Sequence, residues 1–305
     1  MRRLLAIVFV CCGLAVTLPG CSSVNSTPEA DVASVSYESA EVSFLGPEGT
    51  YTQEACEVFF DGNGTYLPCD TVSDAVQMLT EGMCDYAVIP QENTIGGAVI
   101  DYVDVLMGTP EVSVAGEVVL TINQNLLVLP GASLDQIETV YSHRQGITQA
   151  QEWLAQNLPD AELIEVSSTA EGARMVAEGD DSSCAAIASA GCADVYDLEV
   201  LASAIQNNDN NRTRFYVLTT EEPSVIDADR TAFIASGSAE YLPDILAGIS
   251  ECGAELITIH DRPLKTQLGE YNYIIECAGL SYEDYLELAS ETSMGMRFLG
   301  CYEVR

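Results

Sequence analysis

The sequence predicts an α/β protein made of two successive parts, and two observations lead to this fold class. Between residues 42 and about 220, short apolar runs alternate with segments whose apolar residues recur at helical spacing. That alternation is typical of a sheet with helices packed on it. From residue 231 the order changes to strand, helix, strand, strand, helix, strand, which is the ferredoxin-like βαββαβ arrangement. A chain of 305 residues is long enough for two such domains.

Apolar runs separated by helical segments predict a mostly parallel sheet in the first part, residues 42–220. The expected strands are Val42–Leu45, Asp85–Pro90, Val118–Thr121, Leu126–Leu129, Ala185–Ala188 and Phe215–Thr219. The expected helices are Thr52–Phe60, Asp74–Glu81, Thr148–Asn157 and Ala170–Glu178. Charge and a proline then interrupt the pattern at 221–229, which predicts a linker.

The second part, residues 230–305, contains four apolar runs and two amphipathic segments. The expected strands are Thr231–Ser236, Glu255–His260, Glu270–Cys277 and Gly295–Tyr302. The expected helices are Leu242–Cys252 and Tyr282–Ser290. Two helices on a four-stranded sheet make a small independent layer, so this part is predicted to form its own domain.

The N-terminus has the pattern of an export signal. Arg2-Arg3 precedes the apolar run Leu4–Val16, which is too short to span a bilayer and suits a signal peptide at 1–20. Leu18-Pro-Gly-Cys21 is similar to a lipobox, which predicts lipidation of Cys21 and a membrane-anchored protein on the extracytoplasmic face. Ordinary secretory cleavage and an uncleaved anchor remain alternatives. Residues 21–41 have the composition of a flexible tether.

The charge balance excludes a generic nucleic-acid binder, because 47 acids stand against 11 bases and give a net charge of −36. Nearly half of the bases fall within a few short motifs, so we expect local cations where an anionic ligand binds. No CxxC or Cys/His pattern of zinc type is present, and neither a metal nor a cofactor is expected. The eight cysteines beyond Cys21 are compatible with disulfides or with free buried thiols.

Five motifs occur in a fixed order. They are Phe44-Leu-Gly-Pro-Glu-Gly-Thr-Tyr51, Ile89-Pro-Gln-Glu-Asn-Thr-Ile95, Tyr141-Ser-His-Arg-Gln-Gly-Ile-Thr-Gln149, Asn210-Asn-Arg-Thr-Arg-Phe215 and Ile259-His-Asp-Arg-Pro-Leu-Lys-Thr-Gln-Leu-Gly-Glu-Tyr-Asn272. Over residues 42–305 the chain resembles prephenate dehydratase with a C-terminal ACT regulatory domain. The resemblance implies a two-lobed, periplasmic-binding-protein-like catalytic domain with its site in the interlobe cleft. It also implies decarboxylating dehydration of prephenate to phenylpyruvate in phenylalanine biosynthesis.

The resemblance also implies which residues act. Thr213 stands beside the leaving hydroxyl, where a hydroxyl can donate to developing negative charge; its alternative is to cap a turn. Asn93, Gln149 and Glu92 complete the expected catalytic set. The expected substrate contacts are Thr50, Tyr51, Thr94, Ser142, Arg214 and Phe215. Arg214 has the planar fork that suits a carboxylate, and Phe215 has strand packing as its alternative.

The effector site of the ACT domain is expected to be altered. Its positions correspond to Glu240, Leu242, His260, Asp261, Arg262 and Pro263. Glu240 stands where the family keeps glycine, and its carboxylate is expected to repel the carboxylate of L-phenylalanine. We therefore expect feedback inhibition to be lost, and the domain to serve the packing of a homodimer or homotetramer.

Two other kinds of function are compatible with an exported two-lobed protein, because a fold does not fix a function. One is a lipoprotein that binds an aromatic acid or amino acid without catalysis. The other is an interaction protein with a relict site. The presence of Thr213, Asn93 and Gln149 favours the enzyme, because a pure binder has little need of a donor to a leaving group.

Overall fold

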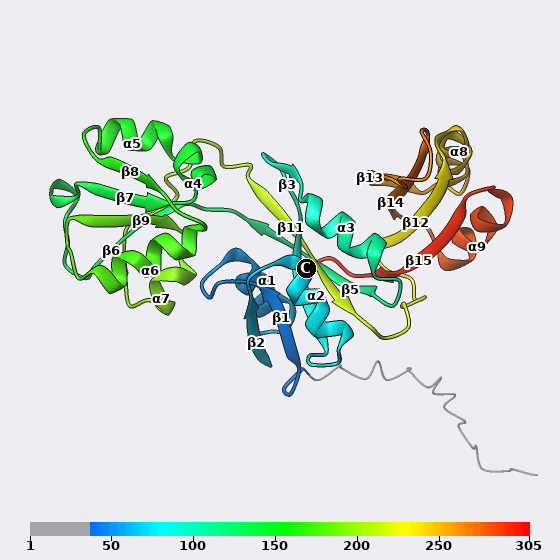
Figure 1. Ribbon diagram of the computed structural model, residues 1–305, viewed down its shortest axis with the longest axis horizontal. Helices are drawn as coiled ribbons and strands as arrows, with labels where there is room; N and C mark the ends of the chain where they lie inside the picture. Colours follow the sequence, from blue (N-terminus) through cyan, green and yellow to red (C-terminus); the bar gives the residue numbers. More distant parts are fainter. Residues whose placement is uncertain (1–36) are drawn as a thin grey trace, which may run out of the picture. The chain divides into compact units, whose positions relative to one another are not determined.

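The structure is a computed structural model that describes residues 37–305, which form one compact unit with three sheets. The predicted signal peptide, Cys21 and most of the predicted tether lie outside the described residues. In Figure 1 the chain forms most of the first sheet, then the whole second sheet, and returns to the first sheet before it forms the third. The α/β class predicted from the sequence is confirmed.

The first lobe contains a six-stranded sheet in the order β2-β1-β3-β11-β5, with β4 paired to β3. Its strands are β1 (Glu41–Leu45), β2 (Thr65–Cys69), β3 (Tyr86–Asn93), β4 (Gly97–Ala98), β5 (Ser113–Thr121) and β11 (Arg212–Thr219). β1 is parallel to β2 and β3, whereas β11 is antiparallel to β3 and β5. The sheet is mixed rather than mostly parallel, because the chain leaves the lobe after β5 and re-enters it as β11.

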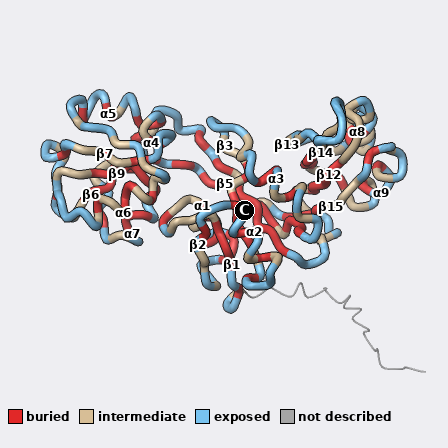
Figure 2. Tube along the Cα trace, in the orientation of Figure 1, coloured by how far each residue is buried: buried red, intermediate tan, exposed pale blue. Residues whose placement is uncertain are grey.

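Helices cover both faces of this sheet. They are α1 (Tyr51–Phe59), α2 (Val72–Thr80) and α3 (Ile100–Gly108). On one face α1 packs Phe59 against Phe215 and Val217. On the other face α2 and α3 pack against Tyr216 and Leu218. Successive residues of β11 therefore point to opposite faces, as strand geometry requires. Figure 2 shows the centre of this lobe, around β5, largely buried.

The second lobe has a five-stranded sheet in the order β10-β6-β9-β7-β8. Its strands are β6 (Asn125–Val128), β7 (Thr139–Ser142), β8 (Glu162–Glu165), β9 (Cys184–Ala188) and β10 (Glu199–Ala202), and its helices are α4 (Arg144–Gln149), α5 (Gln151–Asn157), α6 (Thr169–Gly179) and α7 (Gly191–Val195). The single helix predicted over Thr148–Asn157 is two helices that meet at Ala150, whose φ of −102° and ψ of 9° leave the helical region. The two lobes agree with the two-lobed expectation.

The C-terminal sheet has the antiparallel order β13-β14-β12-β15 that defines the ferredoxin-like arrangement. Its elements are β12 (Arg230–Ser238), α8 (Leu242–Glu251), β13 (Glu255–Pro263), β14 (Glu270–Ala278), α9 (Tyr282–Glu291) and β15 (Gly295–Tyr302). The helices pack on one face around Phe233 and Ile275. The other face contributes Ile234 and Leu299 to the core that α3 shares. Residues 221–229 form neither helix nor strand.

Three further features concern only the described residues. The eight cysteines from Cys56 to Cys301 are all free thiols. Among residues 37–305, no cluster of three or more His, Cys, Asp and Glu side chains suits a metal ion. Over the same residues, no helix has the length and apolarity needed to cross a bilayer.

Candidate active site

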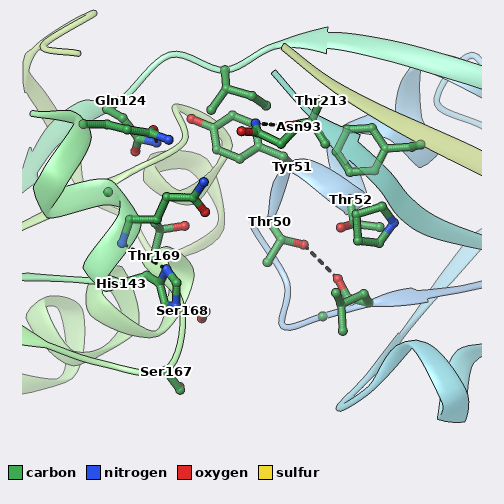
Figure 3. Close-up of a pocket in the computed structure, with 18 residues that line it drawn as sticks. Thr50, Tyr51, Thr52, Asn93, Gln124, His143, Ser167, Ser168, Thr169 and Thr213 are labelled. Atoms are coloured by element: carbon green, nitrogen blue, oxygen red, sulfur yellow. Dashed lines mark hydrogen bonds between the residues drawn. The ribbon is translucent and has the colours of Figure 1, made fainter. Parts of the chain in front are cut away.

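A pocket of about 270 Å³ lies between the first and second lobes. Figure 3 shows its walls coming from the loop and first turn of α1, from the ends of β3 and β11, and from the N-terminal turns of α4 and α6. The lining residues are Leu45, Gly46, Thr50, Tyr51, Thr52, Pro90, Asn93, Ile122, Gln124, His143, Gln145, Gly146, Gln149, Ser167, Ser168, Thr169, Thr213 and Phe215. Six of the predicted site residues are among them: Thr50, Tyr51, Asn93, Gln149, Thr213 and Phe215.

The pairing of two strands brings Thr213 and Asn93 together. β11 lies antiparallel to β3 with these residues opposite each other. The Nδ2 of Asn93 donates to Thr213 Oγ1 at 2.9 Å. The Oδ1 of Asn93 accepts from the backbone N–H groups of Ile95 and Gly96, at 3.0 and 2.8 Å. Because Thr213 Oγ1 accepts from Asn93, its own hydrogen is left to donate toward the pocket.

Gln149 enters the pocket from the last turn of α4 in the second lobe, and its side chain is buried. Its Oε1 accepts from Gln124 Nε2 at 2.9 Å and from Asn211 Nδ2 at 3.2 Å. Both lone pairs of the carbonyl are thus engaged, so the amino group of the same amide is the part that can donate to a ligand. The sequence had not identified Gln124 or Asn211 as site residues. Asn211 stands inside a motif and could have been found there.

Two helix N-termini face the pocket. Thr50, Tyr51 and Thr52 begin α1, whose N-cap makes no side-chain hydrogen bond, so the first amides of this helix are free of a capping group. Ser168 caps α6 by accepting from Glu171 N at 2.9 Å, and Thr169 follows it in the pocket wall. Helix N-termini favour anions through their amides and their dipole. The loop between Ser167 and Thr169 was not predicted as part of the site.

The pocket wall contains no arginine, lysine or carboxylate. This corrects the expectation that scarce cations gather at the ligand. Tyr51 donates its hydroxyl to the backbone oxygen of Asn123, and burial raises its pKa, so the phenol stays neutral. The wall therefore consists of amides, hydroxyls and apolar side chains, together with the imidazole of His143.

Four predicted site residues lie outside the pocket wall. Ser142 is fully buried, and its hydroxyl donates to Ile187 O at 2.7 Å, which ties β7 to β9 beneath α4. Thr94 Oγ1 donates to Arg212 O at 3.0 Å and accepts from Arg212 N at 3.1 Å, so it joins two chain segments. Glu92 and Arg214 point to the opposite face of the sheet, because each follows or precedes a pocket residue in a strand.

On that opposite face Arg214 is surrounded by protein carboxylates. Its guanidinium donates to both oxygens of Glu117 at 2.7 Å, to Glu276 at 2.8 Å and to Glu92 at 3.3 Å. Glu117 is 1% exposed and Glu276 is fully buried. Burial disfavours the charged guanidinium, but the hydrogen bond to Glu117 and the nearby charges of Glu276 and Glu117 outweigh it and raise the pKa of Arg214. With its fork already occupied, Arg214 is not placed to bind a substrate carboxylate.

The residues of the predicted effector site lie at one end of the C-terminal sheet. Glu240 is exposed in a 3-10 turn before Leu242, which begins α8. His260–Pro263 ends β13, and Asp261 pairs with Tyr273 of β14. Arg262 donates to both oxygens of Asp104 in α3 at 2.7 Å, and His260 contacts the hydroxyl of Tyr102 in the same helix. This motif therefore also connects the C-terminal sheet to the first lobe.

Comparisons with known proteins match this chain to prephenate dehydratases. A family model described as Prephenate dehydratase matches residues 42–223. A bifunctional chorismate mutase/prephenate dehydratase of Neisseria gonorrhoeae is 35% identical over 267 residues, covering 86% of this chain and 74% of the relative. A prephenate dehydratase of Lactococcus lactis is 32% identical over 277 residues, covering 87% of this chain and 98% of the relative. The crystal structure of prephenate dehydratase from Arthrobacter aurescens in complex with L-Phe is 30% identical, with a TM-score of 0.77, covering 87% of this chain and 90% of the other.

Proposed function

Since the chain belongs to the prephenate dehydratase family, we propose that prephenate binds in the pocket between the lobes and that Thr213 donates to its leaving hydroxyl. The protein is an enzyme that converts prephenate to phenylpyruvate in phenylalanine biosynthesis. The observation that carries the proposed roles is the hydrogen bond from Asn93 Nδ2 to Thr213 Oγ1, because it leaves the threonine hydrogen free to point at the ligand.

The reaction breaks two bonds of the substrate ring. The bond between the ring and its carboxylate gives up its electron pair to the ring, carbon dioxide departs, and the carbon–oxygen bond to the hydroxyl breaks as the ring becomes aromatic. The departing oxygen gains negative charge and takes up one proton, supplied ultimately by solvent, to leave as water. A donor held in place before the reaction stabilises that charge without further reorganisation. Thr213, 9% exposed, occupies such a place.

The two substrate carboxylates need partners in a wall without arginine or lysine. We assign them to the N-terminal turn of α1, with Thr50 and Tyr51, and to the N-terminal turn of α6. The amino group of Gln149 supplies a further donor from the second lobe. Neutral donors in a partly dry pocket suit an anion that must also be released, because hydrogen bonds to backbone amides favour the anion without a buried counter-charge.

Gln149→Glu tests this arrangement in the purified protein, with phenylpyruvate followed in alkali after addition of prephenate. The carboxylate of the variant still accepts from Gln124 and Asn211 but turns negative charge toward the substrate. We expect kcat/KM to fall by about 10²-fold or more, as for the loss of one placed donor. Gln156→Glu, an exposed site in α5, is the matched control and should retain the wild-type rate. Equal rates for the two variants would remove Gln149 from the site.

The C-terminal sheet is proposed to be an ACT domain with a weakened effector site. The relative from Arthrobacter aurescens was solved with L-Phe, which supports this amino acid as the effector class. Glu240 adds a carboxylate, and like charges about 4 Å apart cost on the order of 1 kcal/mol even in water. Titration of L-phenylalanine by calorimetry should show weak binding that Glu240→Gly strengthens about tenfold. Micromolar affinity in the unaltered protein contradicts the proposal.

Export, lipid attachment at Cys21 and a homodimer or homotetramer are further proposals, supported by the sequence pattern of residues 1–21 and by the domain composition. Cys21→Ser should abolish labelling by a fatty-acid analogue and shift the protein out of the membrane fraction. Light scattering of the purified protein should give two or four times the chain mass of 32.7 kDa. Labelling that survives the substitution, or a monomeric mass, rejects the corresponding proposal.

A further inference from the structure

Asn211 lies between the two lobes, immediately before β11, and its side chain is 1% exposed. Its Oδ1 accepts from Asn93 Nδ2 at 2.8 Å. Its Nδ2 donates to Gln149 Oε1 at 3.2 Å. One amide thus connects a side chain of the first lobe with a side chain of the second, and both of these line the pocket.

The side-chain amides of Asn93, Asn211 and Gln149 form a hydrogen-bonded series, and the partners of Asn93 determine the direction of each hydrogen bond in it. Backbone N–H groups of Ile95 and Gly96 can only donate, so the Asn93 group that faces them must be its carbonyl oxygen. The amino group of Asn93 then points at Thr213 and Asn211. Asn211 must in turn accept with its oxygen and donate with its nitrogen. Only one assignment of the amides satisfies all of these contacts.

This fixed assignment of the amides determines which groups two pocket residues present to a ligand. Thr213 receives a hydrogen bond and keeps its hydrogen for the ligand, while Gln149 has its carbonyl engaged and keeps its amino group for the ligand. Gln124 donates to the same carbonyl from the connection between the lobes, at 2.9 Å. Reversal of the Asn211 amide would place two carbonyl oxygens together at Gln149 and two amino groups together at Asn93. Each of these contacts is repulsive.

We propose that Asn211 is a positioning residue: it orders the amides across the cleft so that Thr213 and Gln149 both present donors to the substrate. The inference rests on the proposed roles of those two residues. The side chain of Asn211 must both accept and donate a hydrogen bond in a buried position. Leucine, alanine and an ionised aspartate cannot make both hydrogen bonds. A loss of alignment of this kind typically reduces the rate by more than it reduces substrate affinity.

Asn211→Asp gives the sharpest test, with kcat and KM measured between about pH 5 and pH 8. Ionised, the new carboxylate accepts from Asn93 but repels Gln149 Oε1, so kcat should fall on the order of 10-fold to 10²-fold at pH 8. Protonated, the same carboxyl accepts from Asn93 and donates to Gln149. Burial raises the pKa of a carboxyl, so the ratio of variant to wild-type kcat should rise as the pH is lowered.

Two further variants separate this role from a general structural one. Asn211→Ser, too short to reach both partners, should be slow at every pH with no recovery in acid. Asn210→Asp, the exposed neighbour, should match the wild type throughout. Near-wild-type kcat in both Asn211 variants, or a ratio for Asn211→Asp that is independent of pH, overturns the proposal. If Thr213→Ala and Gln149→Glu are themselves fully active, the proposed catalytic roles fail instead. Thermal unfolding of each variant shows whether a low rate reflects lost structure.

Discussion

The two faces of strand β11 differ in the kind of side chain that they contact. On the face toward the pocket, Thr213 and Phe215 meet neutral amides, hydroxyls and helix N-termini. On the reverse face, Arg214 and Tyr216 meet the buried carboxylate of Glu276 from the C-terminal sheet. The single-residue step between Thr213 and Arg214 therefore separates a site without arginine, lysine or carboxylate side chains from a cluster of one guanidinium and three carboxylates.

The difference shows how an acidic protein can host an anionic substrate. A pocket arginine in this chain would attract the protein's own carboxylates, as Arg214 does. The pocket instead contains groups that favour an anion without being neutralised by a neighbouring glutamate. The charged cluster connects β11 to β5 through Glu117 and to β14 through Glu276, and it contributes no side chain to the pocket wall.

The largest expected effect is on the reverse face. Arg214→Met leaves Glu117 and Glu276 buried without their counter-charge, and removal of one partner of a buried ion pair typically costs about 3–5 kcal/mol. Denaturant unfolding should show this loss, while KM for prephenate changes little in the protein that stays folded. Arg262→Met, at the more exposed pair with Asp104, is the matched control and should cost no more than about 1 kcal/mol.

A large rise in KM with unchanged stability for Arg214→Met would contradict the separation of a substrate-binding face from a structural, charged face. It would restore the guanidinium as the substrate anchor that the sequence had suggested.

The next effect is on the pocket face. Thr213→Ala removes the proposed donor to the leaving hydroxyl, so kcat should fall by about 10²-fold or more with the fold retained. Thr213→Ser keeps a hydroxyl and should retain part of the rate. Thr219→Ala, on the same strand and also buried, is the control, because Thr219 is not part of the pocket wall. Steady-state assays with prephenate measure all three; an alanine variant at position 213 with wild-type turnover refutes the assigned role.

The smallest effect is a pH dependence of stability from the reverse face. Burial raises the pKa of Glu117 above its ordinary 4.5, although the hydrogen bond and charge of Arg214 oppose the shift. At pH values between the unfolded and the folded pKa, the folded protein therefore holds a proton that the unfolded chain has already released. The associated stability is complete below the unfolded pKa and is lost as the pH rises through the folded pKa.

Glu117→Gln should remove this contribution. Between pH 4.5 and the folded pKa of Glu117, the free energy of unfolding of the wild type should fall relative to the variant as the pH rises. Urea unfolding at a series of pH values measures the difference, with exposed Glu138→Gln as the control. Parallel profiles for wild type and Glu117→Gln would mean that Glu117 titrates alike in both states.

Much of the fold followed from the sequence because its signals are local. The segment Gly295–Tyr302 matches β15, since a run of apolar and aromatic residues bounded by glycine specifies a strand without help from distant residues. The strands Thr139–Ser142 and Glu162–Glu165 were not predicted. They are four residues long and partly exposed, so their pattern is too weak to recognise until β7 pairs with β9 and β8 pairs with β7.

The sequence predicted which motifs contribute to the site, but it did not predict which residues of each motif contact the pocket. Thr213, Asn93 and Gln149 were expected, and the structure places all three in one pocket. Arg214 and Glu92 belong to the same motifs, and alternation along the strands directs them to the other face. Ser142 matches a family position but is used to fix β7 to β9. Motif membership does not reveal which face a residue takes when the strand pairing is unknown.

The sequence by itself determined the α/β class, the ferredoxin-like C-terminal arrangement and the amide and hydroxyl groups available for catalysis, because periodicity and residue chemistry are properties of neighbouring residues. Only the tertiary structure decided that β11 enters antiparallel between β3 and β5. That insertion places Asn211 between Asn93 and Gln149, which are 118 and 62 residues away along the chain. A network of directed hydrogen bonds depends on distances of about 3 Å and on which amide end faces which partner, and such distances between remote segments exist only once the sheet has formed.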